Sequence, residues 1–286
     1  MRIAFPAAAG DLARPDPVFT VERAAAEAAG FGVLLYDFVA LWRHEAADLA
    51  ASIAAGAGPA LHRGFMLSDR RHALLRDALA ARGWTLLPDL EGYGQAHFLP
   101  RALPLLGDAT PETVWMLGFD RDEAWALYQR VADGDALLKD HVKSCKERWK
   151  EACFLPAGTS RERFDEVLRA FLACRGAKLE LGLVLRRFEP FRLLRRDMRG
   201  MPIHEEYRTF FWRGAPFWSA LGEDLAPWAA IARRFRSPFV SLDVARREDG
   251  ALRVVESGDG GVTGLPMHCD PDDFYARLAA AIRRDP

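Results

Sequence analysis

Two carboxylates, Asp243 and Glu256, are placed where they could hold a divalent cation. They lie in SLDVARREDGALRVVESGDGG, which is typical of two strands joined by the dipeptide Asp249-Gly250. If that dipeptide forms a two-residue turn, Asp243 lies directly opposite Glu256, with Cβ atoms about 4.5–5.5 Å apart. Two carboxylates at this short distance repel each other unless a cation lies between them. Few oxygen ligands with room for water and phosphate favour Mg²⁺.

Two alternatives remain open for this hairpin. The acids could be ordinary solvated residues at strand ends, with no metal between them. The connection could also be a longer loop with a bulge, and an extra residue in one strand would change which residues face each other.

Lys139 and Lys143, in the segment LLKDHVKS, are candidates for binding an anion. Lys139 ends an apolar strand, and a lysine that emerges from a buried strand costs free energy unless it meets an anion. Together the two lysines could hold polyphosphate oxygens as point charges. The alternative is a pair of exposed lysines at the edge of a loop.

Two arginines could recognise a phosphate or a carboxylate. Strand alternation in HEEYRTFFW puts Arg208 on the same face as Glu206. Arg208 is therefore either part of a cross-strand ion pair or a fixed fork for an anionic ligand. Arg63, in HRGFML, ends a predicted parallel strand, and ligands of such sheets bind at the carboxyl ends of strands.

The first hundred or so residues alternate between apolar strands and amphipathic helices. The strands are RIAFPA, GVLLYDF, ALHRGFMLS and WTLLPD, and helical segments lie between them. This alternation predicts an α/β domain with an open parallel sheet. No GxGxxG or Walker-type loop follows any of these strands, so the usual nucleotide fingerprint is missing here.

The rest of the chain mixes helices with antiparallel hairpins, which indicates an α+β arrangement. We expect three parts, at residues 1–105, 106–190 and 191–286. The last part carries the candidate metal-binding hairpin.

Composition excludes several classes of protein. The chain has 286 residues, 50% of them hydrophobic, and a formal net charge of −1. This charge balance gives no field that would attract nucleic acid or an anionic membrane. No apolar run approaches the roughly 20 residues of a transmembrane helix. The four cysteines form no CxxC pair and no zinc-spaced cluster, so we expect a reduced, cytoplasmic protein.

The order of these motifs resembles the ATP-grasp superfamily, in particular a bacterial and phage clade of stand-alone ATP-grasp proteins. The resemblance rests on LLKDHVKS, LVLRRFEPF, EEYRTFFWRG and SLDVARREDGALRVVESGDGGVTGLP. It implies a Rossmann-like pre-ATP-grasp domain followed by a two-lobed ATP-grasp fold.

The resemblance also implies roles for individual residues. It places ATP against six residues: Lys139, Lys143, Ser144, Arg187, Phe188 and Glu189. It directs Arg208 at the γ-phosphate or at an acyl phosphate, and it makes Asp243 and Glu256 ligands of Mg²⁺. Many members have an Asn two residues after the second metal carboxylate. Here that position is Gly258, which makes Asp259 a candidate third ligand.

The implied activity is that of an ATP- and Mg²⁺-dependent carboxylate–amine or carboxylate–thiol ligase. Such an enzyme acts through an acyl phosphate, releases ADP and phosphate, and needs no protein nucleophile. Its substrates would be small-molecule or peptide carboxylates and amines, and Arg63 would help to define them. A phosphotransferase on the same scaffold and a non-catalytic ATP-binding module are the alternatives. The sequence specifies neither the substrates nor the oligomeric state.

Overall fold

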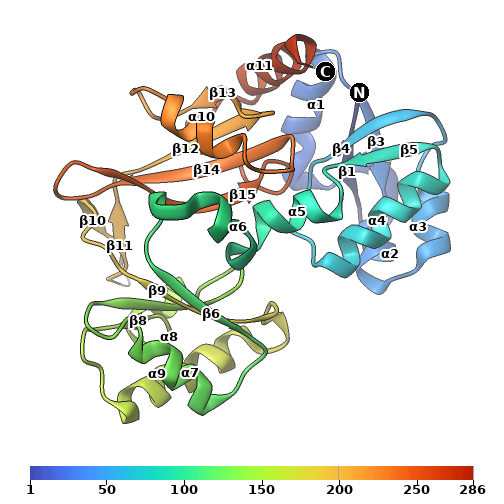
Figure 1. The fold of residues 1–286 in the computed structure, drawn as a ribbon. Helices are drawn as coiled ribbons and strands as arrows, with labels where there is room; N and C mark the ends of the chain where they lie inside the picture. Colours follow the sequence, from blue (N-terminus) through green and yellow to red (C-terminus); the bar gives the residue numbers. More distant parts are fainter. Residues whose placement is uncertain (199, 286) are drawn as a thin grey trace. The chain divides into compact units, whose positions relative to one another are not determined.

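The computed structural model describes residues 1–198 and 200–285. By its contacts the chain divides into two units (Figure 1). Unit 1 comprises Met1–Ala96, Arg208–Leu242 and Gly258–Pro286, and unit 2 comprises His97–Tyr207 and Asp243–Ser257. Both units are assembled from separated segments of the chain. The three continuous parts expected from the sequence stay a prediction.

The N-terminal part of unit 1 is the expected parallel α/β sheet. β1 (Arg2–Ala8) pairs in parallel with β3 (Gly32–Tyr36) and with β4 (Gly58–His62), and β4 pairs in parallel with β5 (Trp84–Leu87). β2 (Asp11–Pro15) returns antiparallel to the end of β1. Five helices accompany the sheet: α1 (Thr20–Ala28), α2 (Phe38–Arg43), α3 (Ala46–Ser52), α4 (Asp69–Ala81) and α5 (Leu90–His97).

Later segments of the chain complete unit 1. β12 (Glu206–Trp212) and β13 (Ala215–Ser219) form a hairpin whose turn, Arg213-Gly214, has positive φ at both residues, as a type I′ turn requires. Phe210 of this hairpin packs edge-on against Phe274 of α11 (Pro271–Arg284), with ring centroids 4.9 Å apart. α10 (Ala226–Ala232) follows the hairpin.

Unit 2 contains an antiparallel sheet in the order β6-β9-β7-β8. Its strands are β6 (Thr113–Leu117), β7 (Ala136–Asp140), β8 (Phe154–Leu155) and β9 (Gly182–Arg187). Helices α7 (Arg121–Gln129) and α9 (Arg161–Arg175) lie on one face of this sheet (Figure 1), and α8 (Trp149–Ala152) precedes β8. The core between sheet and helices includes Leu138, Leu185 and Phe164, all buried.

Several further elements contribute residues to unit 2. β10 (Leu193–Arg196) and β11 (Pro202–His204) form a short hairpin after β9, and α6 (Leu99–Leu106) precedes β6. β14 (Phe239–Arg246) and β15 (Leu252–Asp259) lie in a sheet of the order β13-β12-β14-β15.

The connection between β14 and β15 differs from the predicted two-residue turn. The amide of Gly250 donates to the carbonyl oxygen of Arg247 at 3.0 Å, and the amide of Arg247 donates to Ala251 at 2.8 Å. Gly250 has φ +89°, so the connection is a three-residue loop that ends in a glycine bulge. Next to the turn the register is therefore shifted by one residue. The pairing of Asp243 with Glu256 stays a prediction.

The cysteines also differ from the expectation of four reduced thiols. Cys145 and Cys174 form a disulfide, and Cys153 and Cys269 are free and buried. The pair is 29 residues apart in the chain, and no spacing rule links such distant cysteines.

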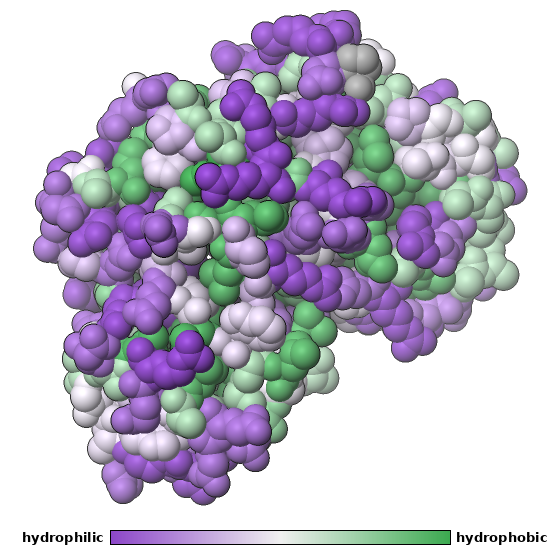
Figure 2. Space-filling model, viewed as in Figure 1, coloured by the Kyte–Doolittle hydropathy of each residue, from purple (hydrophilic) through white to green (hydrophobic). Residues whose placement is uncertain are grey.

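Hydrophilic side chains cover most of the face shown in Figure 2, in keeping with a chain of which 28% is charged. Within the described ranges, no helix has both the length and the apolar character needed to cross a membrane.

Candidate functional site

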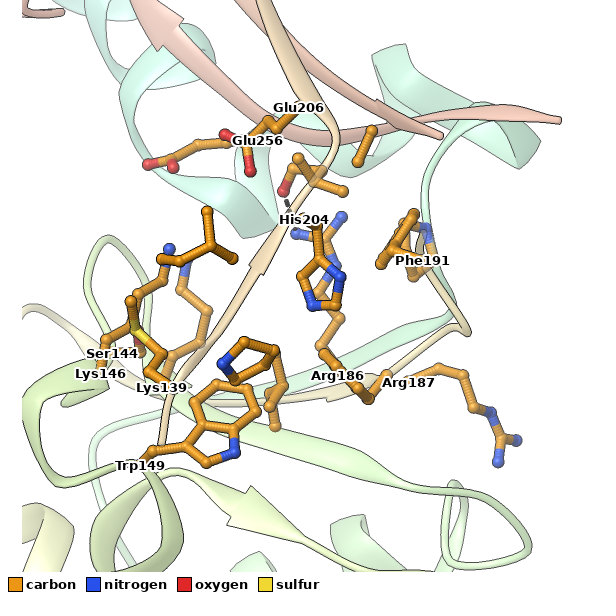
Figure 3. A pocket seen from close by; sticks show the side chains of 18 of the residues that line it. Lys139, Ser144, Lys146, Trp149, Arg186, Arg187, Phe191, His204, Glu206 and Glu256 are labelled. Carbon is orange, nitrogen blue, oxygen red and sulfur yellow. Dashed lines mark hydrogen bonds between the residues drawn. The ribbon is translucent and has the colours of Figure 1, made fainter. Parts of the chain in front are cut away.

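A cavity of about 530 Å³ lies within unit 2 (Figure 3). Strands β7 and β9, the loop after β7, the hairpin β10–β11 and the strand β15 all contribute side chains to it. Six of the residues predicted from the sequence line this cavity: Lys139, Lys143, Ser144, Arg187, Phe188 and Glu256. The structure therefore brings together residues that are more than a hundred positions apart in the chain.

The pleat of β7 directs Lys139 into the cavity. Leu138 is fully buried in the core under the helices, so its neighbour Lys139 points to the other face of the sheet. Burial lowers the pKa of Lys139 to about 8, although the carboxylate of Glu256 acts in the opposite direction. A partly desolvated cation of this kind is suited to meeting an anionic ligand.

Arg186 is a cavity residue that the sequence reasoning missed. Its Nη1 donates to the carbonyl oxygen of Val255 at 2.6 Å. Its Nη2 donates to Thr110 Oγ1 at 2.6 Å and to the carbonyl oxygen of Val254 at 3.1 Å. Burial lowers the pKa of Arg186 to about 10, and nearby Glu256 offsets part of that effect. The guanidinium thus anchors the backbone of β15 immediately before Glu256.

Arg187, the arginine expected from the sequence, has its guanidinium elsewhere. Nη2 donates to Asp133 at 2.7 Å and to Glu112 at 3.0 Å. In Figure 3 its head group points away from the cavity, whereas that of Arg186 points inward. Arg187 lines the cavity, but its charge is paired with these two acids.

One end of the cavity is aromatic. The ring of Phe188 lies 5.7 Å from Trp149 and 5.7 Å from His204, and His204 lies 5.8 Å from Phe191. Burial lowers the pKa of His204, which favours the neutral imidazole. Flat apolar walls of this kind suit a planar heteroaromatic ring.

The other end of the cavity is charged. Glu206 and Glu256 lie on one side, and Lys139 and Lys146 lie across from them (Figure 3). Lysine side chains can bind phosphate oxygens, and carboxylates can coordinate a hard divalent cation. The cavity therefore combines aromatic walls, cations and carboxylates in one continuous space.

The sequence over residues 127–278 matches the ATP-grasp domain, R2K clade family 3. This match covers more than half of the chain. The protein belongs to this ATP-grasp family. The resemblance inferred from the motifs is thereby confirmed.

Solved ATP-grasp structures share the fold over nearly the whole chain. The RimK domain protein ATP-grasp from Sphaerobacter thermophilus DSM 20745 is 17% identical, with 99% of this chain and 100% of that chain covered and a TM-score of 0.61. D-cycloserine synthetase DcsG is 14% identical, with 99% of both chains covered and a TM-score of 0.59. At such identities the likeness establishes the two-lobed ATP-grasp fold and no more.

The macrocyclase MdnC from Microcystis aeruginosa MRC, solved with the precursor peptide MdnA, is a further ATP-grasp neighbour. It is 13% identical, with 97% of this chain and 99% of that chain covered and a TM-score of 0.55. No curated protein matches the chain by sequence.

Two residues of unit 2 that were expected at the ATP-grasp site do not line the cavity. Glu189 accepts from Arg253 Nη2 at 3.0 Å and lies 3.7 Å from Arg247 Nη1. Asp243 is 3% exposed within β14. The ion pairs of Glu189 and the burial of Asp243 could not be predicted from the sequence, because they depend on tertiary contacts.

Arg63 lies in unit 1 and is almost fully buried. Its Nε and Nη2 donate to the two carboxylate oxygens of Glu22 at 2.6 and 2.8 Å. Its Nη1 donates to the carbonyl oxygens of Thr263 at 2.5 Å and Gly260 at 3.2 Å. The guanidinium therefore connects the end of β4 with the glycine-rich segment after β15.

Asp259 also lies in unit 1, at the end of β15. Its Oδ1 accepts from the amide of Gly261 at 2.9 Å, and its Oδ2 accepts from Ser237 Oγ at 3.2 Å. Burial raises the pKa of Asp259 to about 7, and these two hydrogen bonds oppose the rise.

Gly258 stands where many ATP-grasp members have Asn, and the structure gives a steric reason. A Cβ atom there would clash with the hydroxyls of Thr263 and Ser241, which are themselves 2.8 Å apart. A side chain in this position would require these hydroxyls to move.

Arg208 belongs to unit 1, where its Nη1 donates to the carbonyl oxygen of Gly264 at 2.8 Å. Its expected contact with a phosphate stays a prediction.

Across the described part of the chain, one set of three potential metal ligands brings its donor atoms within 4.8 Å of one another: Cys145, Glu147 and Cys174. Two of these ligands are joined in the disulfide, so this set is not suited to Mg²⁺, which prefers oxygen ligands.

Proposed function

We propose that this ATP-grasp protein is a ligase that joins a carboxylate to an amine or a thiol and forms ADP and phosphate. The observation that carries the proposal is the cavity of unit 2. It combines an aromatic end with desolvated cations and carboxylates. This combination matches the three parts of a magnesium-bound nucleoside triphosphate.

The residues at the cavity divide between these three parts. The base lies against Phe188, Trp149 and His204, and the phosphates lie against the lysines of β7 and the following loop: Lys139, Lys143 and Lys146. Ser144, in the same loop, offers a hydroxyl and a backbone amide to the nucleotide.

Glu256 is the first candidate ligand for Mg²⁺, since it lines the cavity beside Lys139 and Arg186. Asp243 is its partner by the family motif. We assign Asp259 a different task from the third ligand expected. Both of its oxygens already accept hydrogen bonds, one from Gly261 in the segment that it begins and one from Ser237 before β14. It therefore shapes this segment instead of presenting a free carboxylate.

We assign Arg63 a positioning role for the same reason. Its guanidinium donates to Glu22 and to backbone oxygens of the segment after β15, and its side chain is 4% exposed. A substrate carboxylate would have to displace a buried, bidentate ion pair, which costs several kcal/mol.

The chemistry needs positioned charges and no protein nucleophile. ATP with Mg²⁺ supplies the γ-phosphoryl group that activates the substrate carboxylate. Cations along the cavity offset the negative charge that develops during phosphoryl transfer. Arg208 is proposed to contact the transferred group. An amine or thiol then attacks the activated carbonyl carbon, phosphate leaves, and the proton of the nucleophile passes to solvent or to a neighbouring carboxylate.

The substrate class follows from the fold neighbours only as a proposal. PsnB and MdnC were solved with precursor peptides, and DcsG is a synthetase of the small molecule D-cycloserine. We therefore propose carboxylates and amines carried by peptides or by small molecules.

Nucleotide binding is the first test. Mg-ADP should raise the Tm of the protein, because a ligand that binds the folded state stabilises it. Replacing Lys139 by Gln should weaken binding about tenfold or more, as expected for the loss of a charge-assisted hydrogen bond. Lys150→Gln is the matched control, since Lys150 is an exposed lysine that does not line this cavity. No change of Tm at millimolar Mg-ADP would contradict the proposal.

Turnover is the second test. A ligase forms ADP only when a carboxylate is present, and it forms a stable amide or thioester only when the acceptor is added. A label from the γ-phosphate that ends in a stable product would instead indicate a phosphotransferase. Binding without turnover across broad pools of carboxylates and amines would indicate a binding module.

A further inference from the structure

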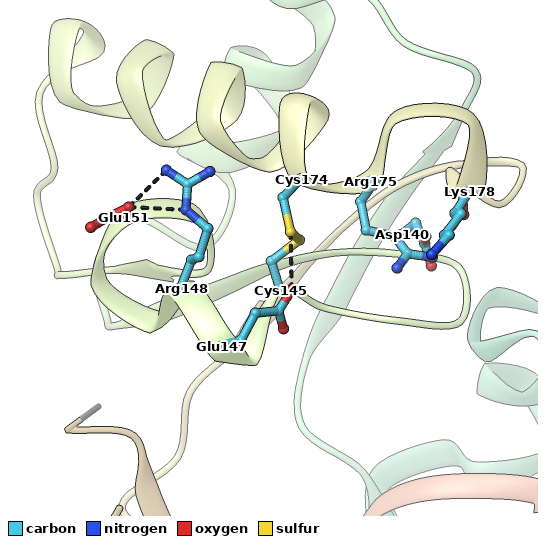
Figure 4. The surroundings of a disulfide bond; sticks show 8 residues. All are labelled: Asp140, Cys145, Glu147, Arg148, Glu151, Cys174, Arg175 and Lys178. Atoms are coloured by element: carbon cyan, nitrogen blue, oxygen red, sulfur yellow. Dashed lines mark hydrogen bonds and ion pairs between the residues drawn. A yellow bond between two sulfur atoms is a disulfide. The ribbon is translucent and has the colours of Figure 1, made fainter. Parts of the chain in front are cut away.

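A disulfide ties the loop that carries the lysines of the cavity to helix α9. Cys145 stands between Ser144 and Lys146, both of which line the cavity. Its partner Cys174 lies in the last turn of α9, with a Cα–Cα distance of 6.6 Å (Figure 4). One end of this covalent link is therefore within one residue of two nucleotide-facing side chains.

The first half of the same loop is held by a separate, non-covalent device. Asp140 Oδ1 accepts from the amides of Val142 at 2.7 Å and Lys143 at 2.5 Å. Its Oδ2 accepts from Arg175 Nε at 2.7 Å, and Arg175 follows Cys174 directly. Asp140 is fully buried, so this half of the loop keeps its shape whatever the state of the sulfurs.

The second half has weaker ties. Ser144 makes an isolated bridge to Lys139, and the amide of Arg148 donates to the carbonyl oxygen of Cys145 at 2.9 Å. Cys145 also packs in the core of unit 2, and the disulfide adds a covalent restraint on the position of residues 144–146. Its loss would leave the loop more conformational freedom, which nucleotide binding would then have to remove.

We propose that the Cys145–Cys174 pair is a thiol–disulfide switch that sets the nucleotide affinity of the cavity. This inference rests on the proposed function. In the disulfide form the loop is pre-organised and binds Mg-nucleotide more tightly. In the dithiol form the same residues bind it more weakly.

The chemistry of the switch balances with ordinary cellular partners. In reduction, a thiolate of a dithiol reductant attacks one sulfur to form a mixed disulfide, and its second thiol displaces that bond. The two cysteines gain two electrons and two protons, and the reductant becomes a disulfide. In oxidation, a peroxide converts one thiolate to a sulfenic acid, which condenses with the other thiol and releases water. Cys174 is the accessible sulfur, since it is half-buried whereas Cys145 is fully buried.

The experiment compares the affinity for Mg-ADP of the two forms of the full chain by calorimetry. Thiol counting defines the forms, because two of the four cysteines are free in the disulfide form. We expect the affinity to fall about fivefold after treatment with a dithiol, a modest change typical of lost pre-organisation.

Serine variants separate the pair from general effects of reductant. Cys145→Ser and Cys174→Ser should bind Mg-ADP like the reduced protein and should not respond to dithiol. Cys269→Ser, a free cysteine in unit 1, should switch like the parent. If Cys145→Ser fails to fold because its site is fully buried, Cys174→Ser at the half-buried end still decides the matter.

Two results would overturn the switch. One is a count of four free thiols that no oxidant lowers. The other is the same affinity in both forms once the disulfide has been confirmed.

If neither form binds Mg-ADP, the proposed function is wrong, and the switch is judged separately by amide hydrogen exchange. Protection of residues 144–148 that is lost on reduction supports the switch, whereas equal exchange in both forms overturns it.

Discussion

Arg186 donates through Nη1 to the carbonyl oxygen of Val255 at 2.6 Å, one residue before the carboxylate expected to hold magnesium. The bond joins β9 to β15 at the charged end of the cavity. It also explains how a fully buried arginine is tolerated, since backbone oxygens and a threonine hydroxyl receive its protons.

Replacing Arg186 by Met should destabilise the protein by about 2–4 kcal/mol, because buried carbonyl oxygens lose their donors. It should also weaken Mg-nucleotide binding, since the position of Glu256 depends on this strand. Urea unfolding and calorimetry measure the two effects. Arg187→Met is the comparison on the same strand. It removes ion pairs with the exposed acids Glu112 and Asp133, which contribute about 0–1 kcal/mol, and one hydrogen bond to the carbonyl oxygen of Val131, so its loss of stability should be smaller. Equal losses in the two variants would contradict the anchoring role.

Replacing Lys139 by Met should have opposite effects on stability and on binding. Burial lowers the pKa of this lysine, so its charge destabilises the nucleotide-free protein at pH 7. The variant should therefore show an unchanged or raised Tm without nucleotide, and its affinity for Mg-ADP should fall at least tenfold. A lower Tm together with unaltered affinity would show that Lys139 is a structural residue.

The affinity for nucleotide should depend on pH through Lys139. Its pKa of about 8 lies below the ordinary value of 10.5. The amino group therefore carries its positive charge below pH 8 and loses that charge as the pH rises through 8. Affinity should be nearly constant from pH 6.5 to 7.5 and then fall, by at most about tenfold per pH unit. Lys139→Arg should flatten this profile, because a guanidinium keeps its charge. A fall that begins only near pH 10 would disprove the shift.

The two predicted metal carboxylates should be essential for turnover and dispensable for folding. Asp243→Asn and Glu256→Gln should each abolish Mg-dependent ADP formation, with the far-ultraviolet circular dichroism unchanged. Glu248→Gln, in the loop between β14 and β15, removes one charge from the same hairpin and should retain activity. Parental turnover in either carboxylate variant would refute the metal assignment.

Asp259 should make the protein less stable as the pH rises from about 4 to 7. Its folded pKa of about 7 exceeds the ordinary value of 3.8 because of burial. The folded state then binds the proton more tightly than the unfolded state, so stability is lost on deprotonation. The difference between the parent and Asp259→Asn in urea unfolding at pH 5 and pH 7.5 isolates this contribution, at most about 1.4 kcal/mol per pH unit. A difference independent of pH would exclude the raised pKa.

The sequence by itself determined the family and the fold class. Strand–helix alternation in residues 1–105 is a local pattern, and it predicted the parallel sheet that β1, β3, β4 and β5 form. The order of the lysine segment, the β9 segment and the acidic hairpin carried the ATP-grasp resemblance that the family match confirmed. Such features can be predicted from the sequence because they depend on neighbouring residues and on motif order.

Other features were decided only by the tertiary structure. Arg186 and Arg187 are adjacent on one strand and point to opposite faces, and the face that α7 and α9 cover decides which one enters the cavity. Two interactions join residues that are distant in the sequence. One is the disulfide between Cys145 and Cys174, and the other is the ion pair between Arg63 and Glu22. The connection between β14 and β15 has one loop residue more than predicted, which shifts the strand register next to the turn. Each of these outcomes depends on packing between elements, and no local pattern encodes that packing.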